Sequence, residues 1–447
     1  MKAMFVDPPV QSAIQSRLGA TGIPSSAYLA PILEEEGHEV KIVDTVTMGY
    51  DLEDVKAEIK RFDPELLGAT SVTPTIYSTY EIAKIAKELN SDCITVVGGP
   101  HPTFAAKRIV EECPYIDVAV RGEGEETLKE LVSTKELDDI KGITYRKCDR
   151  IVENKSRPFI QDLDSLPFPA YHLLPMDKYE LGGFKYATMM TSRGCPFNCI
   201  FCSSSGICGK AWRGNSPDRV LEQIKLLVSE YEISEIEMLD DTFLFDNKRA
   251  RNICDLIIEE GLDVSWSCSS RVDTITKPLA EKLKEAGCHT IYMGIESGSQ
   301  KILNRLRKGV SIEQIKKAVK IVKEAGLDVF GSFVLGVPGE TKRLMEKTVD
   351  FAKKLRLTFA QFTLFTPYPG TEAYEIAERD DLFLTKDWSQ YTTLDPVMKI
   401  SKMTAEEIKG FLTKAYLSFY LRPSYIWDSI KGRRFWGFLK ALLNKKV

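Results

Sequence analysis

Residues 191–202 of this 447-residue chain have the sequence TSRGCPFNCIFC, which places three cysteines within eight positions. They follow an apolar run at 186–191 that is typical of a β-strand. Three thiolates on one loop can hold three irons of a cubic 4Fe-4S cluster and leave the fourth iron without a protein ligand. The alternatives are a four-cysteine zinc site completed by Cys208, or three unrelated core cysteines. The spacing favours the cluster, because no second C-x-x-C pair or histidine stands nearby in the sequence.

Strand and helix patterns alternate from residue 186 onward. Ser311 and Gln314 form a capping box before one of the intervening helices, which Gly326 ends. Six strand-helix units predict a partial (β/α)6 TIM-like barrel rather than a closed barrel of eight, with its site on the rim at the carboxyl ends of the strands. The expected strands lie near 186–191, 235–239, 263–268, 289–294, 329–335 and 359–364.

A C-x-x-x-C-x-x-C motif at the first strand exit of a partial barrel resembles the radical S-adenosylmethionine (SAM) enzymes. In that family the amino and carboxylate groups of SAM chelate the open iron. One electron from the cluster then breaks the sulfonium C–S bond, and the resulting 5′-deoxyadenosyl radical abstracts a substrate hydrogen. The resemblance implies that Cys195, Cys199 and Cys202 bind the cluster and that an external donor such as ferredoxin or flavodoxin supplies the electron. Glycine-containing strand exits at 333–341 and 366–371 also match the family, or are turns only.

The resemblance also implies residues for SAM at later strand exits. Asp240 and Asp241 end the second strand, where relatives recognise the SAM amino group, although such a pair is also typical of a helix N-cap. Arg271 follows the third strand and would pair with the SAM carboxylate, with a surface salt bridge as the alternative. Glu296 and Ser297 are the polar members of a segment that resembles the family's ribose-contacting strand.

The first 130 or so residues alternate short strands and helices, with glycines at the strand exits. This pattern predicts a Rossmann-like, doubly wound parallel sheet that binds ligands beyond the carboxyl ends of its strands. Its motifs occur in the same order as in the cobalamin-binding domain fused ahead of the barrel in class B radical SAM enzymes. The resemblance implies that cobalamin contacts Ser71, Val72, Thr73, Gly98, Gly99, His101, Gly122, Glu123 and Gly124.

The D-x-H-x-x-G motif, by which some corrinoid carriers present a histidine to cobalt, is absent from this sequence. His101 belongs to a G-G-x-H segment instead. We therefore expect a corrinoid between the first domain and the open rim of the barrel, without a cobalt ligand from that motif. The alternative is a Rossmann-like domain that packs on the barrel and binds no cofactor.

The family's chemistry implies the function. Cobalamin-dependent methylation of an unactivated carbon, on a small-molecule or lipid substrate, is the expected activity. Radical cyclisation, C–C bond formation or oxidation of an isoprenoid, lipid or tetrapyrrole without methyl transfer is the first alternative. An iron-sulfur carrier or corrinoid sensor is the non-enzymatic alternative.

The sequence predicts four regions. A cobalamin-binding-like domain spans 1–140, and a linker with a proline-broken stretch spans 141–185. The barrel spans 186–375, and a small helical C-terminal region spans 376–447.

Composition excludes several classes of protein. Apolar residues make up 43% and charged residues 28% of the chain, as in folded globular proteins. The net charge of -4 gives no positive field for nucleic acid. The start does not have the pattern of a signal peptide, and no apolar run reaches the length of a spanning helix, so we expect a cytoplasmic protein.

The last 26 residues differ from the rest of the chain. Residues 422–447 carry seven Lys or Arg and one Asp, a local net charge of +6, together with many bulky apolar side chains. This mixture is typical of an amphipathic helix at a membrane interface. A helix that docks its aromatic side chains onto the barrel is the alternative. The first interpretation suggests peripheral membrane contact and a hydrophobic substrate.

Overall fold

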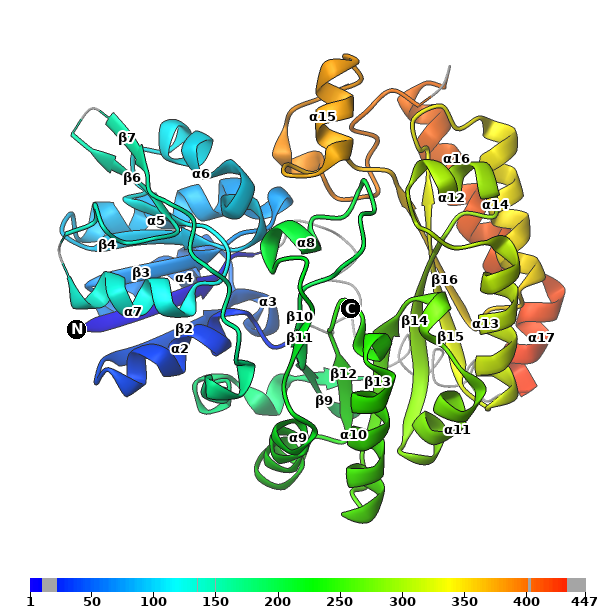
Figure 1. The fold of residues 1–447 in the computed structure, drawn as a ribbon. Coiled ribbons are helices and arrows are strands. Elements are labelled where there is room, and N and C mark those ends of the chain that lie inside the picture. Colours follow the sequence, from blue (N-terminus) through cyan, green and yellow to red (C-terminus); the bar gives the residue numbers. More distant parts are fainter. Residues whose placement is uncertain (10–21, 135, 149, 401–402, 432–447) are drawn as a thin grey trace.

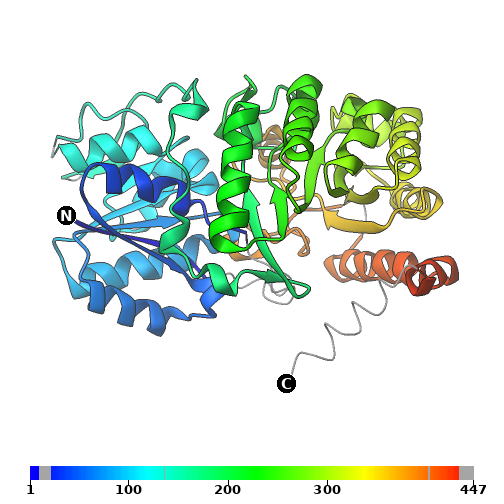
Figure 2. The same ribbon diagram turned by 90° about the horizontal axis from the view of Figure 1, so that it is seen from below.

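A computed structural model describes residues 1–9, 22–134, 136–148, 150–400 and 403–431. It contains two seven-stranded sheets in separate domains, which lie side by side in Figures 1 and 2. The first domain is blue to cyan, and the second is green to yellow. Together they confirm the expected α/β architecture of a doubly wound sheet followed by a partial barrel.

The first sheet has the order β2-β1-β3-β4-β5-β6-β7, and its first five strands in sequence are parallel. The strands β6 and β7 extend it as an antiparallel edge. Its strands are β1 (Lys2–Asp7), β2 (Glu39–Asp44), β3 (Leu66–Thr70), β4 (Ile94–Gly98), β5 (Val118–Val120), β6 (Ile143–Lys147) and β7 (Arg150–Glu153).

Helices cover both faces of this sheet because β1 is apolar on both sides. Ala3 and Phe5 pack with α2 and α7, whereas Met4 and Val6 pack with α4 and α5. The helices are α2 (Ser26–Glu35), α3 (Thr45–Met48), α4 (Leu52–Phe62), α5 (Ile76–Leu89), α6 (Pro100–Glu112) and α7 (Glu125–Ser133).

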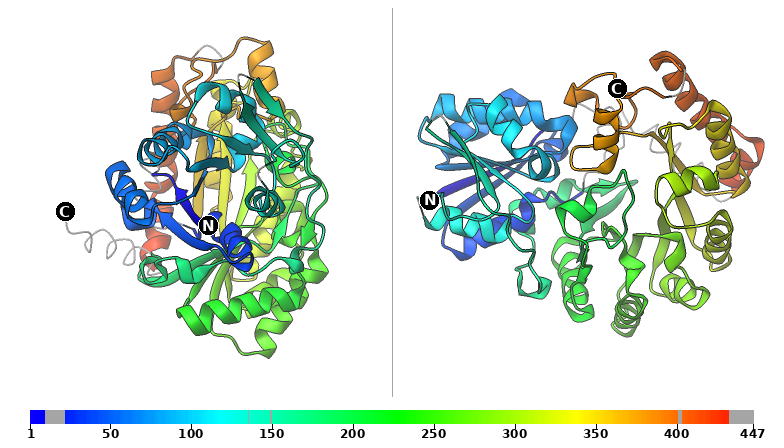
Figure 3. Two further views of the ribbon diagram at one scale, coloured as in Figure 1. Left: turned by 90° about the vertical axis from the view of Figure 1, so that its left-hand side faces the viewer. Right: turned by 45° about the horizontal axis from the view of Figure 1, so that its top comes forward.

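The second sheet has the order β16-β15-β14-β13-β12-β9-β8, with six parallel strands and β8 antiparallel at one edge. The six strands expected from the sequence are confirmed to within two residues at each end. The sheet curls into an open half-barrel with its helices outside (Figure 3, right). Its strands are β8 (Glu180–Leu181), β9 (Phe184–Met189), β12 (Glu235–Met238), β13 (Ser265–Ser270), β14 (Cys288–Glu296), β15 (Asp328–Leu335) and β16 (Phe359–Leu364).

Helices that connect these strands bury apolar side chains against the sheet. Short helices also occur in the loops at the rim, and α15 lies between the two domains (Figures 1 and 3). The helices are α8 (Ser204–Ile207), α9 (Pro217–Tyr231), α10 (Asn247–Glu259), α11 (Lys277–Glu285), α12 (Gln300–Arg305), α13 (Ile312–Glu324), α14 (Lys342–Lys354) and α15 (Glu372–Arg379).

The C-terminal helix α16 (Ala405–Tyr420) covers the free edge of β16. The Tyr416 hydroxyl donates to the Phe362 carbonyl at 2.9 Å and accepts from the Phe362 N–H at 3.1 Å. Tyr420 contacts the backbone of Ala360 in the same way, at 2.9 and 3.1 Å. The two phenols thus replace a neighbouring strand and satisfy the edge.

The chain returns to the first domain after the barrel. Trp388, Tyr391 and Val397 share a hydrophobic core with α5 and α6. The helix α17 (Pro423–Lys431) follows α16, and residues 432–447 of the expected amphipathic segment lie outside the described residues. Within the part of the chain that the structure describes, no helix is both long and apolar enough to cross a membrane.

Candidate cofactor and substrate site

The cysteine loop, residues 194–212, is closed at its base by a short strand pair between the domains. The strands β10 (Ser192–Arg193) and β11 (Arg213–Gly214) pair antiparallel at its base. Gly194 has φ +91°, and a Cβ there would lie 2.3 Å from the Ala211 carbonyl oxygen. The Cys195 N–H donates to the Gly209 carbonyl at 3.2 Å. Only glycine therefore permits the turn that brings the cysteines back toward the barrel.

Three thiols on this loop interact electrostatically with one another, whereas the main electrostatic neighbours of the fourth, Cys208, are other side chains. Cys195 and Cys199 are partly buried and Cys202 is exposed. Burial raises the pKa of both Cys195 and Cys199, and Cys202 raises each of them further. Burial raises the pKa of Cys208 to about 11, and its electrostatic neighbours are arginine and carboxylate side chains instead.

This grouping fits a cubic cluster, which takes one thiolate on each of three irons. No three His, Cys, Asp or Glu side chains converge on a single metal ion within the described ranges, and a cubic cluster does not need this, because each thiolate binds a different iron. Cys195, Cys199 and Cys202 are the residues that would hold the cluster.

A cavity of about 410 Å³ lies inside the barrel rim. Its lining includes Phe201 from the cysteine loop and four charged side chains, which lie at the end of β14 or in the connections that follow β12, β13 and β14. Of the five residues expected to contact SAM, the structure brings Asp241, Arg271 and Glu296 to this cavity, joined by Lys308.

Glu296 and Lys308 form a buried ion pair in the cavity wall, with Nζ and Oε1 2.7 Å apart. Glu296 has φ +62° at a register shift in β14, and this backbone turns its carboxylate toward Lys308. A Cβ at Gly294 would lie 2.4 Å from the carboxylate and 2.6 Å from the ammonium. Burial alone would lower the pKa of Lys308, but Glu296 and Cys199 outweigh it, so the pKa is raised and the ammonium stays charged.

Arg271 is buried beside the cysteine loop rather than placed on the surface. It is 5% exposed, and its guanidinium donates two hydrogen bonds to Asp273, at 2.9 and 3.0 Å. A third hydrogen bond reaches the Lys308 carbonyl at 2.8 Å, and the guanidinium stacks 3.6 Å from the ring centre of Phe197. Arg271 thus joins the loop to the Lys308 side of the cavity.

Asp240 and Ser297, the other two residues expected to contact SAM, bond to neighbouring protein groups instead of lining the cavity. Asp240 is 2% exposed and accepts three hydrogen bonds of 2.6 Å, from the backbone and hydroxyl of Thr191 and from the Ser192 hydroxyl. Ser297 is fully buried against Thr348, 3.0 Å away. Neither is among the described residues that line the cavity.

Asp241 is the exposed member of its pair and accepts a 2.8 Å hydrogen bond from Ser204. The N-cap of α10 is Asp246, whose side chain accepts from the Arg249 N–H at 3.0 Å. The N-cap alternative for Asp240 and Asp241 is therefore wrong.

A second cavity, of about 340 Å³, lies at the carboxyl ends of β1, β3, β4 and β5. Its walls are mostly apolar and glycine-rich, and Gly99 has φ +102° where a Cβ would lie 2.9 Å from the Thr70 hydroxyl. Such walls let backbone N–H groups approach a ligand closely, which suits the nucleotide tail or the side-chain amides of a corrinoid. Of the expected cobalamin contacts, Gly98, Gly99, Gly122, Glu123 and Gly124 line it.

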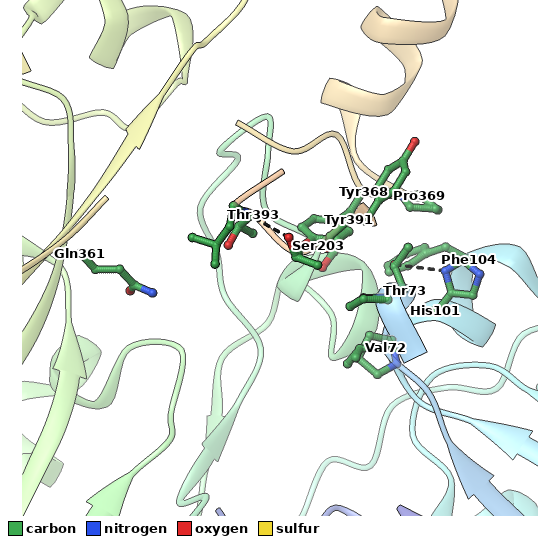
Figure 4. A pocket seen from close by; sticks show the side chains of 14 residues that line it. Val72, Thr73, His101, Phe104, Ser203, Gln361, Tyr368, Pro369, Tyr391 and Thr393 are labelled. Carbon is green, nitrogen blue, oxygen red and sulfur yellow. Dashed lines mark hydrogen bonds between the residues drawn. The ribbon is translucent and has the colours of Figure 1, made fainter. Parts of the chain in front are cut away.

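A third cavity, of about 380 Å³, lies between the two domains. Figure 4 shows Val72, Thr73 and His101 on the first-domain side and Gln361 of β16 across from them. Ser71 is fully buried and is not among the described residues that line either of these cavities.

His101 is fixed in the wall of this third cavity. It is 2% exposed, its Nδ1 lies 3.1 Å from the Thr73 hydroxyl, and its ring packs edge-on against Trp388. Burial lowers the pKa of His101 to about 4, so the imidazole is neutral at physiological pH.

The barrel cavity and the interdomain cavity adjoin each other. Tyr368 and Thr393 line both. A molecule that spans them contacts the Glu296–Lys308 wall at one end and the first domain at the other. Tyr368 belongs to the strand exit at 366–371, whereas nothing in the local pattern around Lys308 and Thr393 marked them as site residues.

Comparison with known proteins identifies both domains. Residues 189–352 match the radical SAM superfamily, and residues 24–132 match the B12 binding domain. The chain is 49% identical to an uncharacterized methyltransferase of Pyrococcus horikoshii, over 95% of this chain and 94% of the relative. It is 30% identical to the anaerobic magnesium-protoporphyrin IX monomethyl ester cyclase of Cereibacter sphaeroides, over 100% of this chain and 76% of the relative.

Solved structures share the fold. The cobalamin-dependent SAM radical enzyme OxsB, with aqua-cobalamin and SAM bound, superposes with a TM-score of 0.76 at 17% identity, over 99% of this chain and 72% of that one. The radical SAM methyltransferase TsrM of Kitasatospora setae, with cobalamin and a [4Fe-4S] cluster bound, gives 0.74 at 17% identity, over 95% and 89%.

Proposed function

Because the chain belongs to the radical SAM enzymes that carry a B12-binding domain, we propose that it transfers a methyl group to an unactivated carbon. Its cofactors are a 4Fe-4S cluster, SAM and cobalamin. When bound, they supply the radical that removes a hydrogen atom and the methyl group that takes its place. As in other radical SAM enzymes, an external donor supplies the electron.

The proposal rests on one observation, that the barrel cavity adjoins the interdomain cavity. A substrate that passes Tyr368 and Thr393 is within reach of both domains, as methyl transfer between them requires. Tyr368 is held in place, since its hydroxyl donates to the Tyr391 carbonyl at 2.8 Å. These residues orient the substrate at the junction.

We infer that Asp241, Arg271, Glu296 and Lys308 hold SAM in the barrel cavity. Asp241 is the carboxylate suited to the SAM ammonium, and Arg271 and Lys308 are the cations suited to its carboxylate. Phe197 and Phe201 lie between the three cysteines in sequence, and Phe201 lines the cavity, where it excludes water.

The interdomain cavity favours a neutral, hydrophobic substrate. Among the described residues that line it, none is Asp, Glu, Lys or Arg, and His101 is neutral. A phosphate or carboxylate in this cavity would lose its hydration without gaining a charged partner. One relative, a hopanoid C-3 methylase of Methylococcus capsulatus, is 24% identical over 88% of this chain.

Cyclisation or oxidation without methyl transfer is the second candidate. The 30% identity to the magnesium-protoporphyrin IX monomethyl ester cyclase extends over the whole chain and favours it. Both candidates use the same 5′-deoxyadenosyl radical and differ only in the fate of the substrate radical.

The test uses the full chain, reconstituted without oxygen with iron, sulfide and hydroxocobalamin. The protein is incubated with titanium(III) citrate, SAM that carries a trideuterated methyl group, and a total lipid extract. We expect 5′-deoxyadenosine, S-adenosylhomocysteine and cobalamin-dependent products that carry the label. 5′-Deoxyadenosine with a consumed but unlabelled substrate would establish the second candidate instead. Absence of 5′-deoxyadenosine would leave only the carrier or sensor.

We propose further that the C-terminal helices bring the enzyme to a lipid surface. Leu417 of α16, Leu421 just after it, and Ile426 and Trp427 of α17 are 40–63% exposed. Residues 422–447 also carry seven Lys or Arg side chains. Apolar and cationic groups together favour anionic lipid headgroups.

Sedimentation with vesicles of equal parts phosphatidylglycerol and phosphatidylcholine tests this surface. We expect the full chain to bind and a chain that ends at Leu421 to bind less. Equal and negligible binding by both would contradict the proposal.

A further inference from the structure

Two arginines and two glutamates form a buried ionic cluster between the domains. Glu123 follows β5 and Glu125 begins α7 in the first domain. Arg193 and Arg213 lie in β10 and β11, at the base of the cysteine loop. Their side chains are only 4–11% exposed.

The four side chains form one continuous hydrogen-bond network. Arg193 donates to Glu125 Oε1 at 2.6 Å and to Glu123 Oε1 at 3.2 Å. Arg213 donates to both Glu123 oxygens, at 2.9 and 3.1 Å. Glu123 therefore holds both arginines. The network is neutral overall, as a buried cluster of charges must be to persist.

Strand register explains why both arginines need one carboxylate. Arg193 and Arg213 are directly opposite each other across the β10–β11 pair. Two like charges at such positions repel each other, and an anion between them offsets this repulsion. Residues 194–212, which include all four loop cysteines, lie between these two strands in sequence. The Glu123 carboxylate therefore binds the residues at both ends of the cysteine loop.

The same network reaches the linker and the far side of the loop. Glu123 Oε2 accepts a 2.7 Å hydrogen bond from the Ile160 N–H. Arg213 also donates to the Cys208 carbonyl at 2.6 Å. One carboxylate thus joins the first domain, the linker and the cysteine loop.

We propose that Glu123, Glu125, Arg193 and Arg213 form an ionic latch that fixes the cysteine loop relative to the first domain. They are positioning residues, and the latch sets the spacing between the cluster and the corrinoid. The inference rests on the proposed function, since a fixed spacing matters only if both domains act in one reaction. It also reassigns the Glu123 side chain, whose carboxylate belongs to the latch.

Amide hydrogen exchange of the full chain without cofactors tests the latch separately from any catalytic activity. Glu123→Gln keeps the shape of the side chain and removes its charge, and Glu125→Gln removes the second carboxylate. Glu126→Gln, at an exposed position on the same helix, is the matched control. We expect amides in 194–212 to exchange about tenfold faster or more in the first two variants, and exchange elsewhere in the barrel to stay unchanged.

A spectroscopic measurement on the reconstituted protein tests the spacing. The reduced cluster and Co(II) are both paramagnetic, so their dipolar coupling reports the distance between them. We expect the coupling to become weaker and more distributed in Glu123→Gln and Glu125→Gln when they are compared with the unaltered protein at equal iron and cobalt contents. Glu126→Gln is expected to match the unaltered protein.

Three outcomes would overturn the latch. One is unchanged exchange in 194–212, and another is an unchanged dipolar coupling. The third is loss of folding in both glutamate variants and in Arg193→Lys, because the network would then be needed for folding and not for position. A protein that shows the expected exchange but transfers no methyl group would retain the latch and refute the proposed function.

Discussion

Lys308 donates a 2.7 Å hydrogen bond to Glu296, and both side chains are less than 10% exposed. The pair is enclosed between Gly294, which has no room for a side chain, and Arg271, whose guanidinium donates to the Lys308 carbonyl. Removal of either partner leaves an uncompensated charge in a buried wall of the barrel cavity. The pair therefore contributes both to the stability of the barrel and to the wall of its cavity.

Lys308→Met is expected to destabilise the protein by about 3–5 kcal/mol, because Glu296 then lies buried without its counter-ion. It should also raise the dissociation constant of SAM about tenfold or more by removing a cation from the cavity. Thermal unfolding and equilibrium dialysis measure the two effects. The double variant Lys308→Met with Glu296→Gln should recover stability but not SAM affinity, and recovery of both would contradict a role in binding.

The cysteine series separates the loop thiols. Cys195→Ala, Cys199→Ala and Cys202→Ala should each lose the 4Fe-4S cluster, because a cubic cluster needs all three thiolates. Cys208→Ala should keep it and is the matched control on the same loop. Iron and sulfide counts after anaerobic reconstitution decide the matter. Full cluster content in Cys199→Ala, or its loss in Cys208→Ala, would refute the assignment.

His101→Asn should leave the cobalt spectrum unchanged. The His101 ring is bound to Thr73 and packed against Trp388, so it contributes to the wall of the cavity and not to the metal. Electron paramagnetic resonance of the reconstituted Co(II) protein measures this directly. A change in nitrogen hyperfine splitting between the variant and the unaltered protein would show that His101 ligates cobalt.

Stability should fall as the pH rises from about 5 to 8 because of Glu340. Burial raises its pKa from 4.5 to about 7, and its Oε1 has no hydrogen-bond partner among the described residues. The folded state thus keeps a proton that the unfolded chain releases above pH 4.5. This stabilisation is complete below pH 4.5 and is lost as the pH approaches 7, at a cost of up to about 3 kcal/mol.

Glu340→Gln is neutral at every pH and should flatten that dependence. Chemical unfolding at pH 5 and pH 8 measures how much stability each protein loses between these two pH values. The difference in this loss between the unaltered protein and the variant isolates the contribution of Glu340. A variant that shows the same fall in stability would exclude Glu340 as its source.

Tyr416→Phe and Tyr420→Phe should each destabilise the protein by about 1 kcal/mol, since each removes the hydroxyl that satisfies the edge of β16. The double variant exposes two backbone positions and should aggregate faster, because free strand edges pair with other chains. Thermal unfolding and light scattering measure these effects. Tyr77→Phe, at a partly exposed position in the first domain, is the control, and equal effects at that position would contradict the role of the edge.

The sequence by itself determined the two-sheet architecture and the cysteine loop. Strand and helix periods are local, so the six barrel strands and the glycine-rich exits of the first sheet could be read without a structure. The spacing of Cys195, Cys199 and Cys202 is likewise local, because one short loop carries all three thiols.

Only the tertiary structure decided what the charged residues do. Asp240 and Asp241 are neighbours in sequence, yet one is enclosed by Thr191 and Ser192 and the other opens to the cavity. Glu123 contacts Arg193 and Arg213, which lie 70 and 90 positions away. A side chain's partner depends on which loops meet when the sheets curl and the domains pack. That information is spread over the whole chain, and no local pattern contains it.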